Sequence, residues 1–187
     1  AETYKRFHEY HDPAWKLAQK AAALARLGLL LDDERCFERA QTWAMHLVEH
    51  DRCHVDHYDA GMCYAHEAGA LADVYALLYP RLAADGRDAL AAHLLRCGEA
   101  VARGRRRWLT DPILTRMAYN NHLIIQHRGS LAAGLVLGRE DWVEGAIDGP
   151  RGFGEILVGA VTDDGLCYES STKYHFATLG GLTGIAE

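Results

Sequence analysis

The chain carries the apolar spacing of amphipathic helices almost throughout, and the strict alternation typical of strands is nearly absent. Short polar turns separate the periodic segments, which predicts paired helices. The expected helices span about 13–31, 32–50, 61–79, 85–103, 120–137, 140–160 and 171–187. Pro13 is expected to open the first, Pro80 to stop the third and Gly138 to end the fifth. Because no fixed repeat period accompanies these helical hairpins, we expect an all-α (α/α) toroid rather than an open solenoid.

Length and charge narrow the class of protein. The 187 residues suit a single domain spanning 1–187, and the net charge of −6, from 26 acids and 20 bases, opposes binding to nucleic acid or to an anionic membrane. No apolar run reaches the roughly 20 residues that cross a bilayer. The five cysteines are irregularly spaced, with no CxxC pair, so we expect buried thiols rather than a disulfide framework. Because the chain stops on "GGLTGIAE", we expect it to be the N-terminal part of a larger protein.

Polar side chains cluster where the fifth expected helix begins, in "NNHLIIQHRGS". One asparagine is explained by N-capping, since the Asn side chain accepts a hydrogen bond from the first turn. Capping does not explain Asn120, Asn121 and His122 together, followed five positions later by the pair His127 and Arg128, near one face of the helix entrance. We therefore expect these five residues to line a cleft.

A second polar group opens the last expected helix, in "DDGLCYESSTKYHFATLGGL", residues 163–182. Ser170 and Ser171 can cap this helix, which places Tyr174 and His175 in its first turn. The segment equally suits a capped helix with a half-buried tyrosine. Since the amides and dipole of a helix N-terminus favour an anion, the two groups together predict an anion-binding catalytic cleft.

Three other features, a group of cysteines and histidines, a glycine-rich stretch and a cluster of arginines, are interpreted as structural rather than functional. Ligand-type residues gather at Cys53, His54, His57, Cys63 and His66, but their spacing is poor for zinc, so we expect cleft-lining or surface histidines and no metal. The stretch "GPRGFGE" lacks the strand and Lys-Ser/Thr of a phosphate loop and is read as a helix junction. The arginines at 103, 105, 106 and 107 are read as a solvated helix end, with guidance of a polyanion as the alternative.

The two polar groups, taken in order and at their spacing, resemble the heparinase II/III-like and alginate lyase superfamily of toroidal polysaccharide lyases. The similarity rests on "NNH…HRGSLAAGLVLG" and "DGLCYESSTKYHFATLGGL" and is strongest over residues 116–187. It implies an (α/α) toroid that is incomplete in this chain and is usually followed by a β-sandwich domain. It also implies β-elimination on a uronic-acid polysaccharide, either alginate or a glycosaminoglycan, without a cofactor.

The resemblance assigns roles to individual residues. Asn121 matches the asparagine that neutralises the uronate carboxylate, Tyr174 matches the catalytic tyrosine, and His122 is either a second neutralising group or the base. Tyr174 could serve as both base and acid in a syn elimination, whereas an anti elimination would use His122 opposite it. Asn120, His127, Arg128, Glu169 and His175 are expected to contact or support the substrate. The sequence before Tyr174 lacks the arginine of some alginate lyases, which favours the heparinase II/III-like branch.

Two rival functions stay open. A glycoside hydrolase on an α/α toroid would need a pair of carboxylates, with Asp163, Asp164 and Glu169 as candidates. A noncatalytic helical module would bind acidic saccharides or proteins without cleaving them. The resemblance favours a periplasmic or secreted bacterial enzyme, with a cytoplasmic oligosaccharide lyase as the alternative, and the sequence leaves the oligomeric state open.

Overall fold

A computed structural model describes residues 2–51, 60–116, 119–165 and 172–186. Over these ranges the regular elements are helices, and the predicted all-α class is confirmed. The helices are α1 (Glu2–Leu31), α2 (Glu34–Glu49), α3 (Ala60–Leu78), α4 (Ala84–Thr110), α5 (Asn121–Leu137), α6 (Glu140–Ile147), α7 (Phe153–Gly159) and α8 (Thr172–Ala186), with a short 3-10 turn η1 (Leu114–Arg116).

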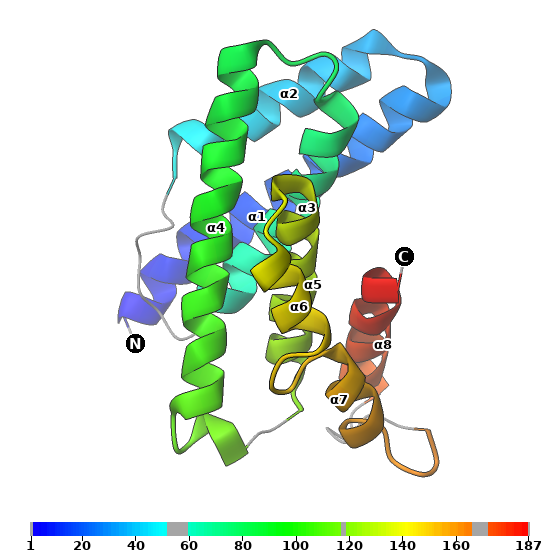
Figure 1. Ribbon diagram of the computed structural model, residues 1–187. Helices are drawn as coiled ribbons and strands as arrows, with labels where there is room; N and C mark the ends of the chain where they lie inside the picture. Colours follow the sequence, from blue (N-terminus) through cyan, green and yellow to red (C-terminus); the bar gives the residue numbers. More distant parts are fainter. Residues whose placement is uncertain (1, 52–59, 117–118, 166–171, 187) are drawn as a thin grey trace.

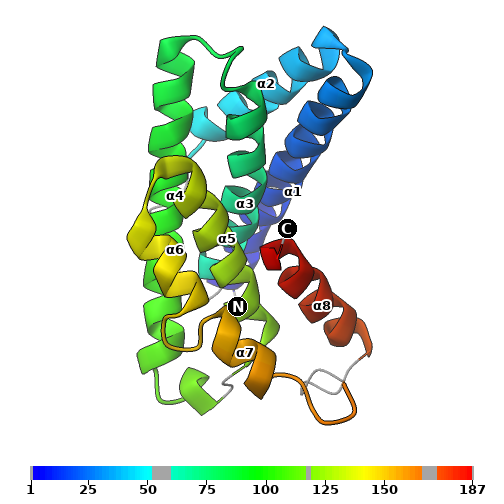
Figure 2. The same cartoon turned by 45° about the vertical axis from the view of Figure 1, so that its right-hand side comes forward.

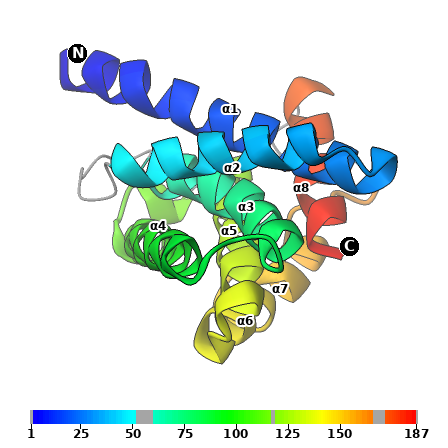
Figure 3. The same ribbon diagram turned by 90° about the horizontal axis from the view of Figure 1, so that it is seen from above.

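Successive helices run back and forth. Figure 1 shows α3 and α4 joined at the top of the molecule, and α5 and α6 joined in the same way beside them. α8 stands against α5 and is reached through the short helix α7 (Figure 2). Seen from above, α1 and α2 cover one side, α6 lies on the opposite side, and α3, α4 and α5 lie between them (Figure 3). α3 lies in this middle layer and packs against α1, α2, α4 and α5.

Most predicted helix boundaries are confirmed. Asn120 caps α5, because its Oδ1 accepts a hydrogen bond from the amide of Leu123 at 3.0 Å. α5 ends at Gly138, whose φ of 65° lies in the left-handed region that glycine adopts without strain. α3 ends at Leu78, two residues before Pro80, as expected.

Three boundaries were predicted wrongly. Pro13 lies inside α1 rather than at its start; the ring removes one hydrogen-bond donor, and the packed alanines that follow hold the helix together. α4 continues through the arginines to Thr110, since buried Val101 and Trp108 anchor its last turns in the core. The segment 140–160 forms two helices, because Gly149 to Gly152 break it, as expected for a helix junction.

The helices pack closely where glycine and alanine face each other. A Cβ added to Gly129 of α5 would lie 2.5 Å from the Cα and carbonyl oxygen of Ala65 in α3. One turn earlier in α3, a Cβ on Gly104 of α4 would lie 2.6 Å from the Cα of Gly61. α1 contributes a row of buried alanines to the same core: Ala14, Ala18, Ala21, Ala22 and Ala25. These contacts hold α1, α4 and α5 tightly around α3.

In the described part of the chain, none of the helices has the combination of length and apolar character that spanning a bilayer requires.

We predict that Gly129→Ala destabilises the fold by about 1–3 kcal/mol, because backbone of α3 occupies the space of the new methyl group. The free energy of unfolding from urea titrations measures this effect. Gly86→Ala is the matched control: the nearest atom to its added Cβ lies 3.9 Å away, so stability should stay equal or rise by up to about 1 kcal/mol. Equal stability of both variants would contradict the close approach of α3 and α5.

Candidate functional site

A groove opens where α1, α3, α5 and α8 meet, and we call it the central groove. It has a volume of about 550 Å³. Its lining residues are Gln19, Ala22 and Arg26 of α1, Ala65, His66, Gly69, Ala70 and Asp73 of α3, Ile125 and Arg128 of α5, and Gly180 and Gly181 of α8. A neighbouring hollow of about 300 Å³ shares Arg26, Gly69, Asp73 and Arg128 and extends along α3 and α5. The two form one elongated depression, a shape that suits a chain-like ligand.

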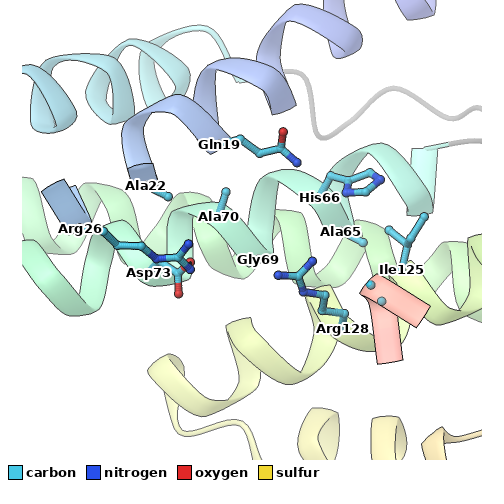
Figure 4. Close-up of a pocket in the computed structure, with 12 residues that line it drawn as sticks. Gln19, Ala22, Arg26, Ala65, His66, Gly69, Ala70, Asp73, Ile125 and Arg128 are labelled. Atoms are coloured by element: carbon cyan, nitrogen blue, oxygen red, sulfur yellow. The ribbon is translucent and has the colours of Figure 1, made fainter. Parts of the chain in front are cut away.

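Small residues keep the central groove open. A Cβ added to Gly69 or Gly180 would meet no atom within 4 Å, so the space above both positions is free. Alanines of α1 and α3 complete the walls. The polar side chains therefore project into a hollow that larger neighbours would fill (Figure 4).

Charged groups of both signs lie in the central groove. Arg26 Nη2 is 2.5 Å from Asp73 Oδ2, an ion pair between α1 and α3 that Figure 4 shows at one end of the groove. Burial raises the pKa of Asp73, while the nearby charges of Arg26 and Arg128 act in the opposite direction. No ion pair of Arg128 is found within the described residues, which leaves its exposed guanidinium able to bind an anion.

His66 is a titratable group on the wall of the central groove. Burial, together with the positive charges of Arg128 and His122, lowers the pKa of His66 to about 4. Its ring stacks on Trp15 of α1 with the ring centroids 4.8 Å apart. At neutral pH the imidazole is therefore uncharged and oriented, and it can accept or donate a hydrogen bond beside a fixed cation.

The first predicted group divides between the surface and the core. Asn121 is the first residue of α5 and is half-buried. It lies four residues before Ile125 and seven before Arg128, so the three share the helix face that borders the central groove. His122 is also half-buried, and its ring lies 5.4 Å from that of Trp108. Asn120 is 1% exposed and caps the helix, so its proposed contact with substrate stays a prediction.

His127 lies on the other side of α5. It is fully buried, and burial, with a further effect from the charge of Arg105, lowers its pKa to about 4. The nearby main chain of Arg151 raises the pKa of His127 by a smaller amount. Neither ring nitrogen of His127 makes a hydrogen bond within the described part of the chain. Gln126 is equally buried, at the Gly61–Gly104 contact. We therefore do not count His127 among the groove residues, and its role in substrate contact stays a prediction.

The second predicted group is only partly described. Tyr174 falls in the first turn of α8, but its side chain lies outside the described residues, as do Glu169, Ser170 and Ser171. His175 is half-buried and lies in a separate, mainly apolar hollow of about 540 Å³ between α7 and α8. The structure thus places His175 away from Arg128, while Gly180 and Gly181 of the same helix border the central groove.

The other predicted features have mixed outcomes. His66 lines the groove, as expected for one of the clustered histidines, whereas Cys53, His54 and His57 lie outside the described residues. Arg103, Arg106 and Arg107 are exposed on α4, as expected for a solvated end. Arg105 differs: it is partly buried, packs over Gly145 of α6, and burial lowers its pKa.

Sequence reasoning missed Gln19, Arg26 and Asp73 as groove residues. No local motif marks them, because each is a separate polar residue among the alanines and leucines of its helix. Their position in the helix could have indicated them. Arg26 lies at helical spacing from the buried Ala22 and Ala25, and a charged residue at such a position indicates a polar surface close to the core.

Comparison with known proteins found no match of this chain to a family model, to a curated protein or to a solved structure. The interpretation of the central groove therefore rests on its residues and geometry.

We predict that acidification destabilises the fold through its buried neutral histidines. Because the pKa values of His66 and His127 fall from 6.5 to about 4 on folding, the unfolded chain binds more protons between these pH values. Their contribution to stability is present above pH 6.5 and is lost as the pH falls toward 4. Lowering the pH from 7 to 5 should cost about 2 kcal/mol for each histidine, measured by urea unfolding.

His127→Leu tests the assignment. In this variant the loss of stability between pH 7 and 5 should be smaller by about 2 kcal/mol. Between pH 7 and 9 the difference between wild type and variant should stay constant. A variant with the same acid dependence as the wild type would show that His127 is not held neutral by burial.

Proposed function

We propose that this protein is a polysaccharide lyase that cleaves a uronic-acid polymer, alginate or a glycosaminoglycan, by β-elimination. The observation that carries the proposal is that both helices opened by the resembling motifs border the central groove. α5 contributes Ile125 and Arg128 to its wall, and α8 contributes Gly180 and Gly181. We further infer that the helical hairpins form part of an (α/α) toroid.

The groove chemistry supports an anionic substrate. Arg128 offers a cation, His66 is neutral beside it, and Gln19 adds an amide from α1. A guanidinium can hold a carboxylate through two parallel hydrogen bonds, which fixes the orientation of the sugar ring. The elongated shape of the groove suits a polymer rather than a compact metabolite.

β-Elimination requires three functions at the uronate. The carboxylate must be neutralised so that charge can develop as the hydrogen at C5 leaves, a base must take that proton, and an acid must protonate the departing O4. In the proposal, Asn121 donates a hydrogen bond to the carboxylate from the groove face of α5, and Arg128 binds an acidic sugar along the same face.

Tyr174 and His122 complete the proposed mechanism. The tyrosine takes the C5 proton, and it either returns a proton to O4 itself in a syn elimination or leaves that step to His122 in an anti elimination. A tyrosine has an ordinary pKa of about 10, so it acts as a base at neutral pH only beside positive charge. Arg128 on α5 is the proposed source of that charge.

We predict that Tyr174→Phe lowers kcat by at least about 100-fold on the cleaved polymer, because the variant lacks the group that moves the proton. The ultraviolet absorbance of the unsaturated product, followed for the full-length protein against alginate, hyaluronate, chondroitin, dermatan and heparan, measures the rate. Tyr79→Phe, at an exposed tyrosine near the end of α3, is the matched control and should keep wild-type activity. Full activity of Tyr174→Phe would overturn the role of the tyrosine.

The same assay separates the rival functions. New reducing ends without ultraviolet absorbance would indicate a hydrolase, and binding without cleavage would indicate a noncatalytic module. If the protein is a lyase, Asn121→Ala should lower kcat by about 100- to 1000-fold. If the protein is a noncatalytic module, the same variant should still bind the polymer.

We predict that Gly69→Leu lowers kcat/KM at least tenfold by filling the central groove. The space above Gly69 is empty, so the leucine enters the groove without displacing backbone, and the helix gains intrinsic stability. Gly86→Leu, in the first turn of α4, is the control for the same substitution outside the groove and should leave kcat/KM unchanged. Unchanged kcat/KM in a folded Gly69→Leu protein would place the substrate elsewhere.

A further inference from the structure

A second set of reactive side chains lies on a different side of α3 from the central groove. Glu67 of α3 faces His93 and Cys97 of α4, and the three are 4%, 1% and 0% exposed. His93 and Cys97 are four residues apart and so share one face of their helix. The three ligand atoms lie within 4.8 Å of one another. This buried group contains the three atom types that bind zinc: carboxylate oxygen, imidazole nitrogen and sulfur.

The distances in this group are close to those around a tetrahedral zinc ion. Cys97 Sγ lies 3.5 Å from His93 Nε2. Bond lengths of about 2.3 Å to sulfur and about 2.0 Å to nitrogen put these two atoms about 3.5 Å apart around tetrahedral zinc. His93 Nε2 lies 2.9 Å from Glu67 Oε1, against about 3.3 Å expected around the ion. The oxygen of Glu67 and the sulfur of Cys97 lie within 4.8 Å of each other, against about 3.5 Å expected around the ion, so binding requires small movements of these side chains toward the metal.

Asp51 supplies the outer partner that a metal-bound histidine usually has. Its Oδ2 lies 3.5 Å from His93 Nδ1, the ring nitrogen that faces away from Glu67, and the same carboxylate is held by Arg96. In metal sites the second imidazole nitrogen commonly donates to a carboxylate, which fixes the tautomer and aims the other nitrogen at the ion.

The charges of the group also need compensation. A neutral imidazole has a single N–H and cannot donate to Glu67 and Asp51 at the same time. A zinc ion between Nε2, Glu67 and Cys97 would leave the single N–H of the neutral ring on Nδ1, where it can point to Asp51. A buried carboxylate without a positive partner is costly, and a zinc ion bound by one carboxylate and one thiolate forms a neutral unit.

We propose that Glu67, His93 and Cys97 bind a zinc ion that links α3 to α4. Binding displaces the thiol proton of Cys97, and the fourth position of the ion is filled by water or a further oxygen ligand. The site is separate from the central groove and has a structural role, because its ligands are buried and join two closely packed helices, α3 and α4. It does not depend on the proposed lyase activity.

One other candidate group exists among the described residues: His46, Glu49 and His50 of α2. All three are exposed and belong to one helix end, so they provide neither sulfur nor a buried environment. Because this group contains no cysteine, cobalt bound there would give no thiolate-to-cobalt absorption band, and the two sites can be told apart.

Cobalt substitution tests the site in the full-length protein. After removal of metal with a chelator, titration with Co²⁺ should give a thiolate-to-cobalt charge-transfer band in the near ultraviolet, and tetrahedral bands in the visible, saturating at one equivalent. Zn²⁺ should displace the cobalt and raise the Tm. Cys97→Ser should remove the charge-transfer band and weaken Zn²⁺ binding at least tenfold, whereas Cys36→Ser and His50→Gln should retain both.

Three outcomes would overturn the proposal. The first is the absence of a thiolate band in the wild type, which requires no variant to fold. The second is an unchanged band in Cys97→Ser, which would assign the thiolate to another cysteine. The third is loss of metal binding in His50→Gln, which would place the ion at the exposed group of α2. If Cys97→Ser does not fold, Asp51→Asn replaces it, with at least tenfold weaker Zn²⁺ binding expected and unchanged binding contradicting the site.

Discussion

The close approach of α3 to α4 and α5 is the contact on which the other features depend. Gly61 and Gly104 allow the backbones of α3 and α4 to touch, and Ala65 and Gly129 do the same for α3 and α5. At such short separations a single methyl group has no room, so the helices are held in one register. The buried alanines of α1 extend this packing to a third neighbour.

The register of α3 places different chemistry on its different sides. One side carries His66, Gly69 and Asp73 into the central groove, and another carries Glu67 to His93 and Cys97 of α4. Since neighbouring residues of a helix point about 100° apart, His66 and Glu67 serve separate environments although they are adjacent in the chain. The central groove stays open because the side chains between its walls are small. At the contact between α3 and α4, by contrast, Glu67, His93 and Cys97 are buried.

Burial is the main influence on the pKa values of two histidines and one groove carboxylate. Burial is the largest cause of the lowered pKa of both His66 and His127 and of the raised pKa of Asp73. The neutral His66 near the exposed Arg128 is a suitable arrangement for an acidic sugar, because the arginine attracts the carboxylate and the imidazole adds a hydrogen bond without repulsion. The same burial makes the fold sensitive to acid.

The sequence by itself determined the helical class, most helix boundaries, the Asn120 cap and the Gly138 stop, because these follow from local periodicity and backbone chemistry. It also singled out Asn121 and Arg128, which share a face by helical spacing alone. Only the tertiary structure decided that His127 is buried, that His175 faces α7, and that Arg26, Asp73 and His66 meet in one groove. It also brought Glu67 to His93 and Cys97. Which helix covers each face depends on packing between residues far apart in the chain, and no local pattern encodes that.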